Sequence, residues 1–376
     1  MLDPHDKSAA RRARLNPGDK AKLIRQRLTA QLLAGAPAGD PVAVAERLLA
    51  VQGQDPRGAR LAIRSRTTGL SAADVDRAFT EDRSIVITWL NRGTLHLVRS
   101  EDYPWLQALT TPPLVTSVDR RLERLGVSPR AAERGGAAIE RSLASDGPLT
   151  RAQLKDRIAA ARVPTEALAL VHVLMLACIR GVAVRGPMHG KQQAYALVRD
   201  WLDEPRAPDR DAALAELARR YLAGHGPATD RDLAKWAGLP LRDARKGLAA
   251  IASELTELEG GLVDLARRGP AADLPPPRLL GSFDPVLLGW TSREPLVGAY
   301  QDRIVANAMF RPFALVRGRA VATWTVSGGA VALEPFGRLS KADRAALEDE
   351  AADVTRFIES SGPAGAAPRS PRRRAD

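Results

Sequence analysis

Two glutamines separated by one glycine form the chemically most distinctive short segment of the chain. Gln52 and Gln54 flank Gly53, and Asp55 follows directly. A carboxamide both donates and accepts hydrogen bonds, so two of them on one short turn are candidate catalytic groups that can hold a polar ligand or a water molecule. A simpler interpretation is that Gln52 ends one helix and Asp55 caps the next, since short polar turns are common.

Motifs for several other chemistries are missing from the sequence. It contains no Walker A loop, no Gly-x-Gly-x-x-Gly segment and no Ser-centred nucleophile elbow. Cys178 is the only cysteine, and the His, Cys and acidic residues show no metal-ligand spacing. We therefore expect neither a metal nor a cofactor, and ATPase, dehydrogenase and α/β-hydrolase activities are disfavoured.

A basic stripe is predicted on the helix after the glutamine pair. Arg57, Arg60 and Arg64 are spaced by three and four residues, so they share one helical face that can neutralise DNA phosphates. A solvated amphipathic face would show the same spacing. Arg92, in the predicted hairpin turn Asn91-Arg92-Gly93, and His96 on the outgoing strand are further candidate DNA contacts. For His96, a half-buried structural histidine is the simpler interpretation.

A second Gly-rich turn carries three more candidate DNA contacts. Arg185, His189 and Lys191 lie on or beside this turn, and Met188 is an apolar side chain that can wedge between bases. A plain solvent-exposed turn is the competing interpretation.

The overall charge favours a polyanionic partner. The 56 Lys and Arg residues outnumber 44 Asp and Glu, giving a net charge of +12 at pH 7. Such a surplus is typical of nucleic-acid-binding proteins, although Arg, Ala and Gly richness is also typical of proteins from high-GC bacterial genomes. Part of the surplus lies in residues 1–16 and 361–376, which are polar or rich in Pro, Gly and Ala and are predicted to be disordered.

The sequence predicts a cytoplasmic protein, associated with the nucleoid when bound to DNA. No apolar run reaches the roughly 20 residues of a membrane span. The first residues, Met1 to Arg14, are polar and basic, unlike a secretory signal. We expect a monomer with double-stranded DNA as its partner and no membrane contact.

A repeated pattern predicts the architecture of the middle of the chain. Gly147-Pro148 and Gly226-Pro227 are each preceded by a helical segment and followed by a Thr suited to cap a second helix. A third helix and a β-hairpin complete each copy. Helix, helix, helix and hairpin is the winged-helix order, and two copies at a constant offset are harder to obtain by chance than one.

The remaining segments complete the predicted fold, which is of the α+β class. The N-terminal part shows the same winged-helix order, and short β-type runs followed by a closing helix predict a small, barrel-like β-rich domain at the C-terminal end. The predicted domains are a disordered basic N-terminus (1–16), winged helix 1 (17–125), winged helix 2 (126–205), winged helix 3 (206–269), the β-rich domain (278–360) and a disordered basic tail (361–376).

The third helix of the second unit is not suited to reading a DNA groove. Residues 165–180 are almost wholly apolar, and a helix that is apolar all round is buried. The units are therefore expected to stack on each other rather than to bind an operator as a repressor does.

Four segments resemble the bacterial winged-helix DNA glycosylases of the AlkZ and YcaQ type. They are 48–66, Trp89–Val98, Ser282–Gly289 and 310–324, and the resemblance extends over roughly 20–358. It implies tandem winged helices and a C-terminal β domain arranged in a C-shape around DNA. It also implies excision of N-alkylated purines, in some members from interstrand crosslinks left by genotoxic natural products. The catalytic Gln-x-Gln motif of the AlkZ subgroup falls on Gln52 and Gln54, whereas the YcaQ subgroup has Asp at the second position.

Neutral amides suit this chemistry. An N7-alkylpurine is already cationic, so no strong acid is needed to expel it, and amide oxygens can orient water and stabilise a cationic sugar. Two other functions stay open. One is a non-catalytic winged-helix DNA-binding protein, such as a transcriptional regulator, which has no need of the glutamine pair. The other is an RNA-binding module, for which 4% aromatic residues provide no evident stacking surface.

Overall fold

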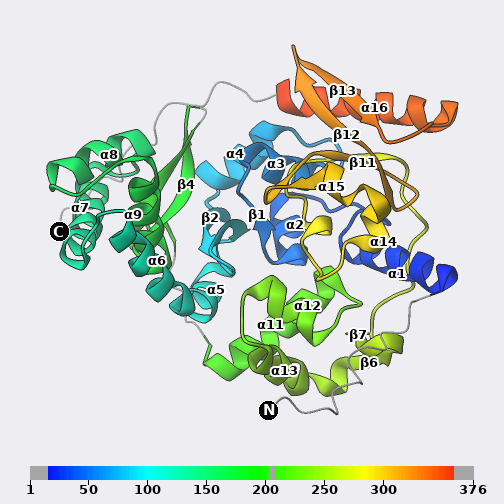
Figure 1. The fold of residues 1–376 in the computed structure, drawn as a ribbon, viewed down its shortest axis with the longest axis horizontal. Helices are drawn as coiled ribbons and strands as arrows, with labels where there is room; N and C mark the ends of the chain where they lie inside the picture. Colours follow the sequence, from blue (N-terminus) through cyan, green and yellow to red (C-terminus); the bar gives the residue numbers. More distant parts are fainter. Residues whose placement is uncertain (1–15, 191, 203–207, 360–376) are drawn as a thin grey trace, which may run out of the picture.

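The computed structural model describes residues 16–190, 192–202 and 208–359, which form a mixed structure of helices and sheets. Figure 1 shows the N-terminal elements with three groups around them: α7–α9 on one side, α11–α13 below, and the C-terminal strands with α16 above. Of the two ends predicted to be disordered, only Asn16, which caps the first helix, lies within the described residues. No helix of the described part is long and apolar enough to cross a membrane.

The N-terminal group begins where the sequence places its caps. Asp40, Asp55 and Ser71 each accept a backbone hydrogen bond at the start of a helix, two of them directly before a proline. The group contains α1 (Pro17–Ala30), α2 (Pro41–Leu48), β1 (Val51–Gln52), α3 (Pro56–Arg64), α4 (Ala72–Thr80), β2 (Ile85–Leu90), β3 (Thr94–Arg99), α5 (Tyr103–Thr110) and α6 (Pro112–Arg124). The strand β1 and the helices α5 and α6 were not expected from the sequence.

The repeat seen in the sequence is also a repeat in structure. One copy contains α7 (Pro129–Asp146), α8 (Arg151–Ala160), α9 (Ala167–Ile179), β4 (Ala183–His189) and β5 (Gln192–Leu197), followed by α10 (Val198–Trp201). The other contains α11 (Arg210–His225), α12 (Asp230–Ala237), α13 (Leu241–Ala250), β6 (Leu255–Leu258) and β7 (Leu262–Leu265). Thr150 and Thr229 form equivalent capping boxes. Leu149 and Ala228, just after the two Gly-Pro pairs, each bridge the second strand of their hairpin.

The hairpins of the first two groups merge into one sheet. Its strand order is β1-β3-β2-β4-β5, and β2 joins β4 through the pair Ile87 and Arg185. The hairpin β6–β7 stays a separate two-stranded sheet. Hydrogen bonding therefore continues across the boundary predicted at residues 125 and 126, so the first two predicted units share a sheet.

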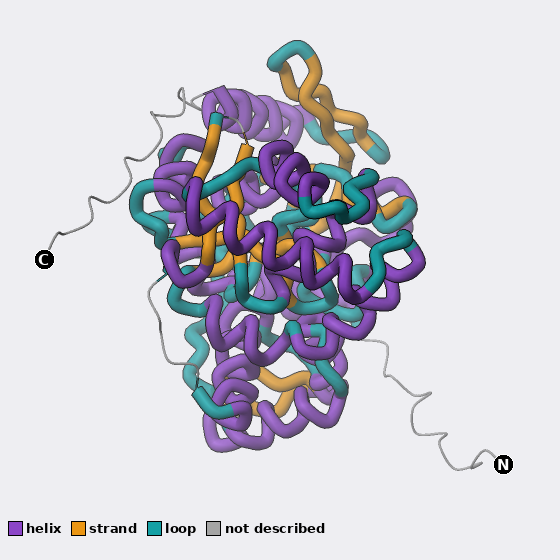
Figure 2. Tube along the Cα trace, turned by 90° about the vertical axis from the view of Figure 1, so that its left-hand side faces the viewer, coloured by secondary structure: helices purple, strands orange, loops and turns teal. Residues whose placement is uncertain are grey.

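The C-terminal region contains an open sheet, which corrects the barrel-like shape expected from the sequence. The order is β13-β12-β11-β8, with β13 and β8 as free edges, so the strands do not close on themselves. The strands are β8 (Arg278–Leu280), β11 (Phe313–Val316), β12 (Arg319–Ser327) and β13 (Ala330–Pro335), and α16 (Lys341–Glu359) packs beside them. Figure 2 shows the hairpin β12–β13 projecting from the body. Between β8 and β11 lie α14 (Glu294–Val297), α15 (Gln301–Ile304), β9 (Val305–Ala306) and β10 (Met309–Phe310).

A fully buried ion pair ties the N-terminal group to the C-terminal region. Arg66 donates two hydrogen bonds to the carboxylate of Asp284, at 2.8 and 2.9 Å, and both side chains have no exposed surface. Arg66 also donates to the backbone and side-chain oxygens of Gln31, at 2.8 and 3.1 Å. Because an isolated buried charge is costly, this network fixes the position of the segment around Asp284.

Candidate active site

The glutamine pair lies at the point where the edge strand β1 gives way to α3. Gln52 is the last residue of β1 and pairs with His96 of β3, and Gly53 continues the pairing by donating to the carbonyl of Leu95 at 2.7 Å. Gln52 is only 6% exposed, whereas Gln54 is exposed. The expectation that both amides project from one surface turn is therefore wrong for Gln52, which belongs to the sheet.

Gln52 lies on the same sheet face as His96, because directly paired residues of antiparallel strands point to the same side. His96 is 2% exposed, and its Nδ1 lies 2.9 Å from the carbonyl oxygen of Thr94. Since a carbonyl only accepts, the proton belongs on Nδ1 and leaves Nε2 as an acceptor. Burial, reinforced by the charge of Arg92, lowers the pKa of His96 to about 3. His96 is thus neutral at pH 7, and its burial agrees with the simpler interpretation of a structural histidine, whereas a contact with DNA stays a prediction.

Arg92 connects Gln52 with the group α11–α13. One nitrogen of its guanidinium, Nη2, lies 3.5 Å from Oε1 of Gln52, and Nη1 donates to the carbonyl oxygens of Lys235 and Trp236 in α12. Burial, followed by repulsion from Arg293, lowers its pKa. The hairpin turn therefore packs against α12 while it keeps a charged group beside Gln52.

A large cleft of about 1310 Å³ opens next to Gln54. Strands β2–β5 form its floor, and α3, α4, α9 and the end of α16 contribute to its walls. Four residues proposed as site residues from the sequence line it: Gln54, Arg57, Arg60 and Arg185. The structure thus brings together one candidate catalytic amide and three candidate DNA contacts that are far apart in sequence.

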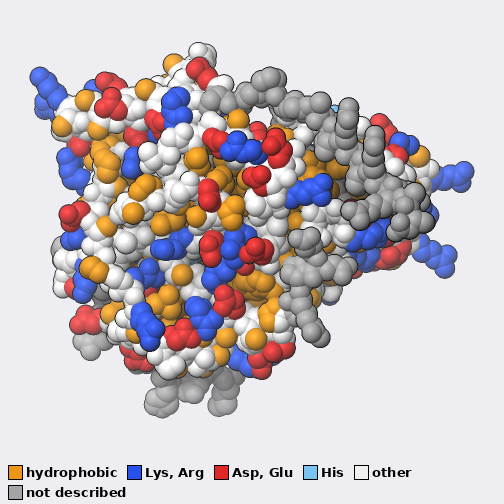
Figure 3. All heavy atoms as spheres, turned by 180° about the vertical axis from the view of Figure 1, so that it is seen from behind, with side chains coloured by type: hydrophobic (Ala, Val, Ile, Leu, Met, Phe, Trp, Pro, Cys, Tyr) orange, Lys and Arg blue, Asp and Glu red, His pale blue; other side chains and the backbone are white. Residues whose placement is uncertain are grey.

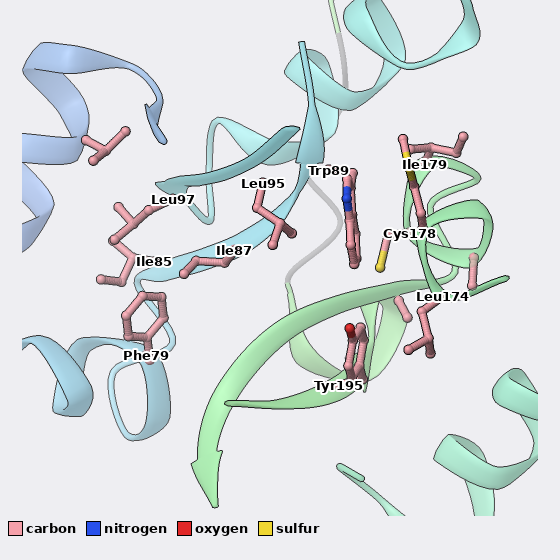
Figure 4. Close-up of a cluster of buried hydrophobic side chains, with 14 of the residues drawn as sticks. Phe79, Ile85, Ile87, Trp89, Leu95, Leu97, Leu174, Cys178, Ile179 and Tyr195 are labelled. Carbon is pink, nitrogen blue, oxygen red and sulfur yellow. The ribbon is translucent and has the colours of Figure 1, made fainter. Parts of the chain in front are cut away.

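The cleft floor has an aromatic and aliphatic part. Trp89 and Leu95 are paired across β2 and β3, and Tyr195 lies on β5. Figure 4 shows Trp89 and Tyr195 near Leu174 and Cys178, at one end of the buried cluster. Burial raises the pKa of Cys178 to about 12, so its thiol is not a reactive group. An apolar floor beside polar walls suits a flat, partly apolar ligand.

The basic stripe predicted on α3 needs correction at Arg64, while DNA contacts of Arg57 and Arg60 remain predictions. Arg64 is 5% exposed and donates to the carboxylates of Glu350 and Asp353 in α16, at 2.9 and 2.7 Å. A buried arginine with two carboxylate partners is not available to a phosphate. Arg60 lines the cleft but donates to Asp76 at 2.8 Å, so much of its charge is neutralised. Arg57 is exposed and remains a predicted DNA contact.

The second Gly-rich turn lines the cleft through Met188 and Gly190. Arg185 lies 5.9 Å from the centre of the Tyr195 ring and faces the cleft with Met188. His189 is exposed at the end of β4, and Lys191 lies outside the described residues. Contacts of these residues with DNA remain predictions.

Three further polar residues were missed in the sequence. Gln193 lines the cleft, is 6% exposed, and has no hydrogen-bond partner for its amide among the described residues. Lys235 and Arg293 lie near Arg92, as their lowered pKa values and the hydrogen bonds above indicate. No local spacing marks these residues, since they reach the site only through contacts between distant segments.

Net charge alone does not identify the DNA-binding face. On the face seen in Figure 3, acidic and basic side chains are interspersed. The cationic groups around Gln52 and Gln54 are therefore a better guide to the site than the overall charge.

Among residues 16–190, 192–202 and 208–359, no group of three or more His, Cys, Asp or Glu side chains is arranged to hold a metal ion.

The buried His96 predicts that acid destabilises the fold. Its pKa is about 3 in the folded protein and about 6.5 in an unfolded chain, so the unfolded state binds the proton first as the pH falls. The stability it contributes is complete above pH ~6.5 and is lost progressively towards pH 3, by at most about 1.4 kcal/mol per pH unit. Urea unfolding at several pH values measures this slope.

The variant His96→Asn should show a smaller slope of unfolding free energy against pH than the unmodified protein. His189→Asn is the matched control, because His189 is exposed and its replacement should leave the slope unchanged. Equal slopes for all three proteins would show that His96 is not a buried neutral histidine.

Comparison with known proteins defines the class of this fold and site. A family model described as "DNA glycosylase AlkZ-like" matches residues 45–357. The chain therefore belongs to the AlkZ-like DNA glycosylase family, and it is a DNA repair enzyme that acts on DNA.

Two comparisons with proteins of Streptomyces sahachiroi agree with this assignment. The chain is 30% identical over 340 residues to a protein named interstrand DNA cross-link repair glycosylase, covering 83% of this chain and 89% of that protein. The solved structure of Streptomyces sahachiroi DNA glycosylase AlkZ matches with a TM-score of 0.71 and 25% identity, covering 90% of this chain and 96% of that one.

Proposed function

We propose that this enzyme hydrolyses the glycosidic bond of cationic N7-alkylpurines in double-stranded DNA, with Gln52 and Gln54 as its catalytic residues. The observation that carries the proposal is the placement of Gln54, an exposed amide on the wall of a large cleft, two residues from a buried amide held beside Arg92 and His96. Asp76, Glu81 and Glu359 line the same cleft, and Asp76 is already paired with Arg60. The proposal assigns the chemistry to the two amides, which cannot protonate a leaving base, so it fits a substrate that already carries its own activating charge.

The reaction follows from the charge of the substrate. Alkylation at N7 makes the purine cationic, so breaking the C1′–N9 bond returns an electron pair to N9 and releases a neutral base. The sugar becomes an oxocarbenium ion, water adds at C1′, and one proton leaves to solvent. Amide oxygens of Gln52 and Gln54 orient that water and stabilise the positive sugar, a role that needs no strong base.

The size of the cleft supports bulky substrates. At about 1310 Å³ it is much larger than a single purine needs, and its floor combines Trp89, Leu95 and Tyr195 with polar walls. We extend the proposal to bulky adducts and interstrand crosslinks, including those left by genotoxic natural products. The name of the relative with 30% identity, a cross-link repair glycosylase, supports this extension.

We also propose that the enzyme binds DNA as a monomer through tandem winged helices in a C-shaped arrangement. The equivalent bridges at Leu149 and Ala228, and the equivalent capping boxes at Thr150 and Thr229, support a duplicated three-helix and hairpin unit. Each hairpin takes the place of a wing. An enzyme that binds DNA in this way is expected to associate with the nucleoid.

The proposed mechanism predicts an intact abasic site as the product. Amides cannot form a Schiff base with the sugar, and no lysine lies among the described residues that line the cleft. After incubation with the enzyme, duplex DNA containing N7-methylguanine should therefore show strand breaks only when it is treated with hot alkali. Borohydride added during the reaction should trap no covalent protein–DNA complex. Strand cleavage without alkali, together with a borohydride-trapped complex, would contradict the hydrolytic mechanism.

A further inference from the structure

Three cationic residues from distant segments lie near one another, and one of them, Arg92, lies beside Gln52. Arg92 comes from the β2–β3 turn, Lys235 from α12, and Arg293 from the segment before α14. Arg92 donates to the carbonyl of Lys235 at 3.4 Å, and Nζ of Lys235 donates to the carbonyl of Thr291, also at 3.4 Å. Through these contacts the N-terminal group, the group α11–α13 and the C-terminal region meet at one place.

The charge of this cluster is not neutralised by the protein. Within the described parts of the chain, none of the three cations has a carboxylate partner at ion-pair distance. Arg293 instead donates to the carbonyl of Leu287 at 2.6 Å, and its guanidinium lies 5.0 Å from the centre of the Phe310 ring. The nearest acidic influence on Lys235 is Asp232. That carboxylate already accepts hydrogen bonds from the backbone and hydroxyl of Thr291, at 2.8 and 2.7 Å.

Like charges held close together repel each other, although Lys235 is exposed and Arg92 and Arg293 are half-buried. Burial is the largest cause of the lowered pKa of Lys235, and Arg293 and Arg92 add repulsion. The pKa of Arg92 is lowered by burial and then by Arg293. The mutual repulsion of these cations is relieved when an anion binds between them. The geometry therefore resembles a preformed anion site.

We propose that Arg92, Lys235 and Arg293 bind one backbone phosphate of the DNA strand that carries the damaged base. The proposal rests on the glycosylase function above and names the contact that positions the DNA strand next to Gln52. Arginine forks and a lysine ammonium suit the non-bridging oxygens of a phosphate. Because Nη2 of Arg92 is 3.5 Å from Oε1 of Gln52, a phosphate on Arg92 lies one side chain away from the catalytic amide.

The position of the cluster makes the phosphate useful for the chemistry as well as for binding. Gln52 shares a sheet face with His96, whereas Leu95, on the opposite face, lines the cleft with Gln54. A strand that crosses the end of β1 can thus place its phosphate on Arg92 and its damaged base in the cleft. The charge of Arg92, held beside Gln52, would raise the energy of the developing oxocarbenium ion, and a bound phosphate cancels this repulsion.

The first test is the salt dependence of binding to an undamaged duplex. Each neutralised phosphate contributes a slope of about 0.9 in log K against log salt concentration. The variants Lys235→Gln and Arg293→Gln, separately and together, should lower the slope, and the double variant should lose about 0.9 in total, because both cations serve one phosphate. The exposed Arg141→Gln on α7 is the matched control and should keep the wild-type slope. A wild-type slope in the double variant would overturn the proposal.

The second test identifies the phosphate. Duplexes that each carry one neutral methylphosphonate, at successive positions around an N7-methylguanine, are compared for binding to the wild type and to the double variant. At one position the methylphosphonate should weaken wild-type binding several-fold and leave the double variant unaffected. Equal losses for both proteins at every position would overturn the proposal. Both readouts are binding measurements, so failure of base excision would contradict the proposed substrate without affecting them.

Discussion

Replacing Gln54 with alanine is expected to lower single-turnover excision of N7-methylguanine by about tenfold to a thousandfold, the range typical of removing one preorganised polar group. Gln54 is exposed and neutralises no phosphate, so binding to undamaged duplex and the urea midpoint should change little. The exposed Gln301→Ala on α15 is a matched control and should excise at the wild-type rate. Wild-type excision by a folded Gln54→Ala protein would remove Gln54 from the mechanism.

The Gln52→Ala variant should lose a similar factor in excision but should also be less stable. Gln52 is buried in the sheet, and its amide oxygen faces the guanidinium of Arg92. Losing a buried polar partner costs about 1–3 kcal/mol. Rates must therefore be compared per folded molecule, with the folded fraction taken from urea unfolding. A stable Gln52→Ala protein with the wild-type rate would contradict both the catalytic role and the structural one.

The largest expected effect on stability comes from the Arg66–Asp284 pair. Asp284→Ala leaves a guanidinium buried without its carboxylate, which is expected to cost about 3–5 kcal/mol of unfolding free energy. Asp284 also accepts a hydrogen bond from the backbone of Val286, at 3.0 Å, so the 285–287 turn loses its cap as well. Urea unfolding measures the loss.

Two comparisons keep this prediction testable. If Asp284→Ala does not fold, the double variant Arg66→Met with Asp284→Leu should recover much of the stability, because no unpaired charge remains. The exposed pair Arg157–Asp146, with side chains 57% and 35% exposed, is the matched control, and Asp146→Ala should cost less than about 1 kcal/mol. Equal losses in Asp284→Ala and Asp146→Ala would show that the buried pair does not hold the C-terminal segment.

Local signals in the sequence predicted many individual elements. Caps such as Asp55 before Pro56, the Asn91-Arg92-Gly93 turn and the two Gly-Pro pairs each act within a few residues, so their effects are visible in the sequence. The two-residue strand β1 was missed because it is too short to show alternation. It forms only by pairing with β3, more than forty residues later. The joined sheet was missed for the same reason, since β2 and β4 meet through a single long-range pair.

In the candidate site too, local signals were visible in the sequence and long-range contacts were not. The glutamine pair was evident from spacing, but the burial of Gln52 depends on the pairing of β1 with β3. Helical spacing placed Arg64 on a stripe with Arg57, yet its carboxylate partners come from α16, at the far end of the chain. Lys235 and Arg293 carry no local signature. Spacing identifies which side chains share a face, whereas the partner of that face is set by tertiary packing.

The most direct test of the central claim is to detect the released base. Purified protein is incubated with duplex DNA containing a single N7-methylguanine, and the small-molecule fraction is analysed by mass spectrometry. The account predicts free N7-methylguanine in amounts equal to the abasic sites formed, and far less of it at early times with Gln54→Ala. Duplex binding by the folded wild-type protein without release of N7-methylguanine would contradict it.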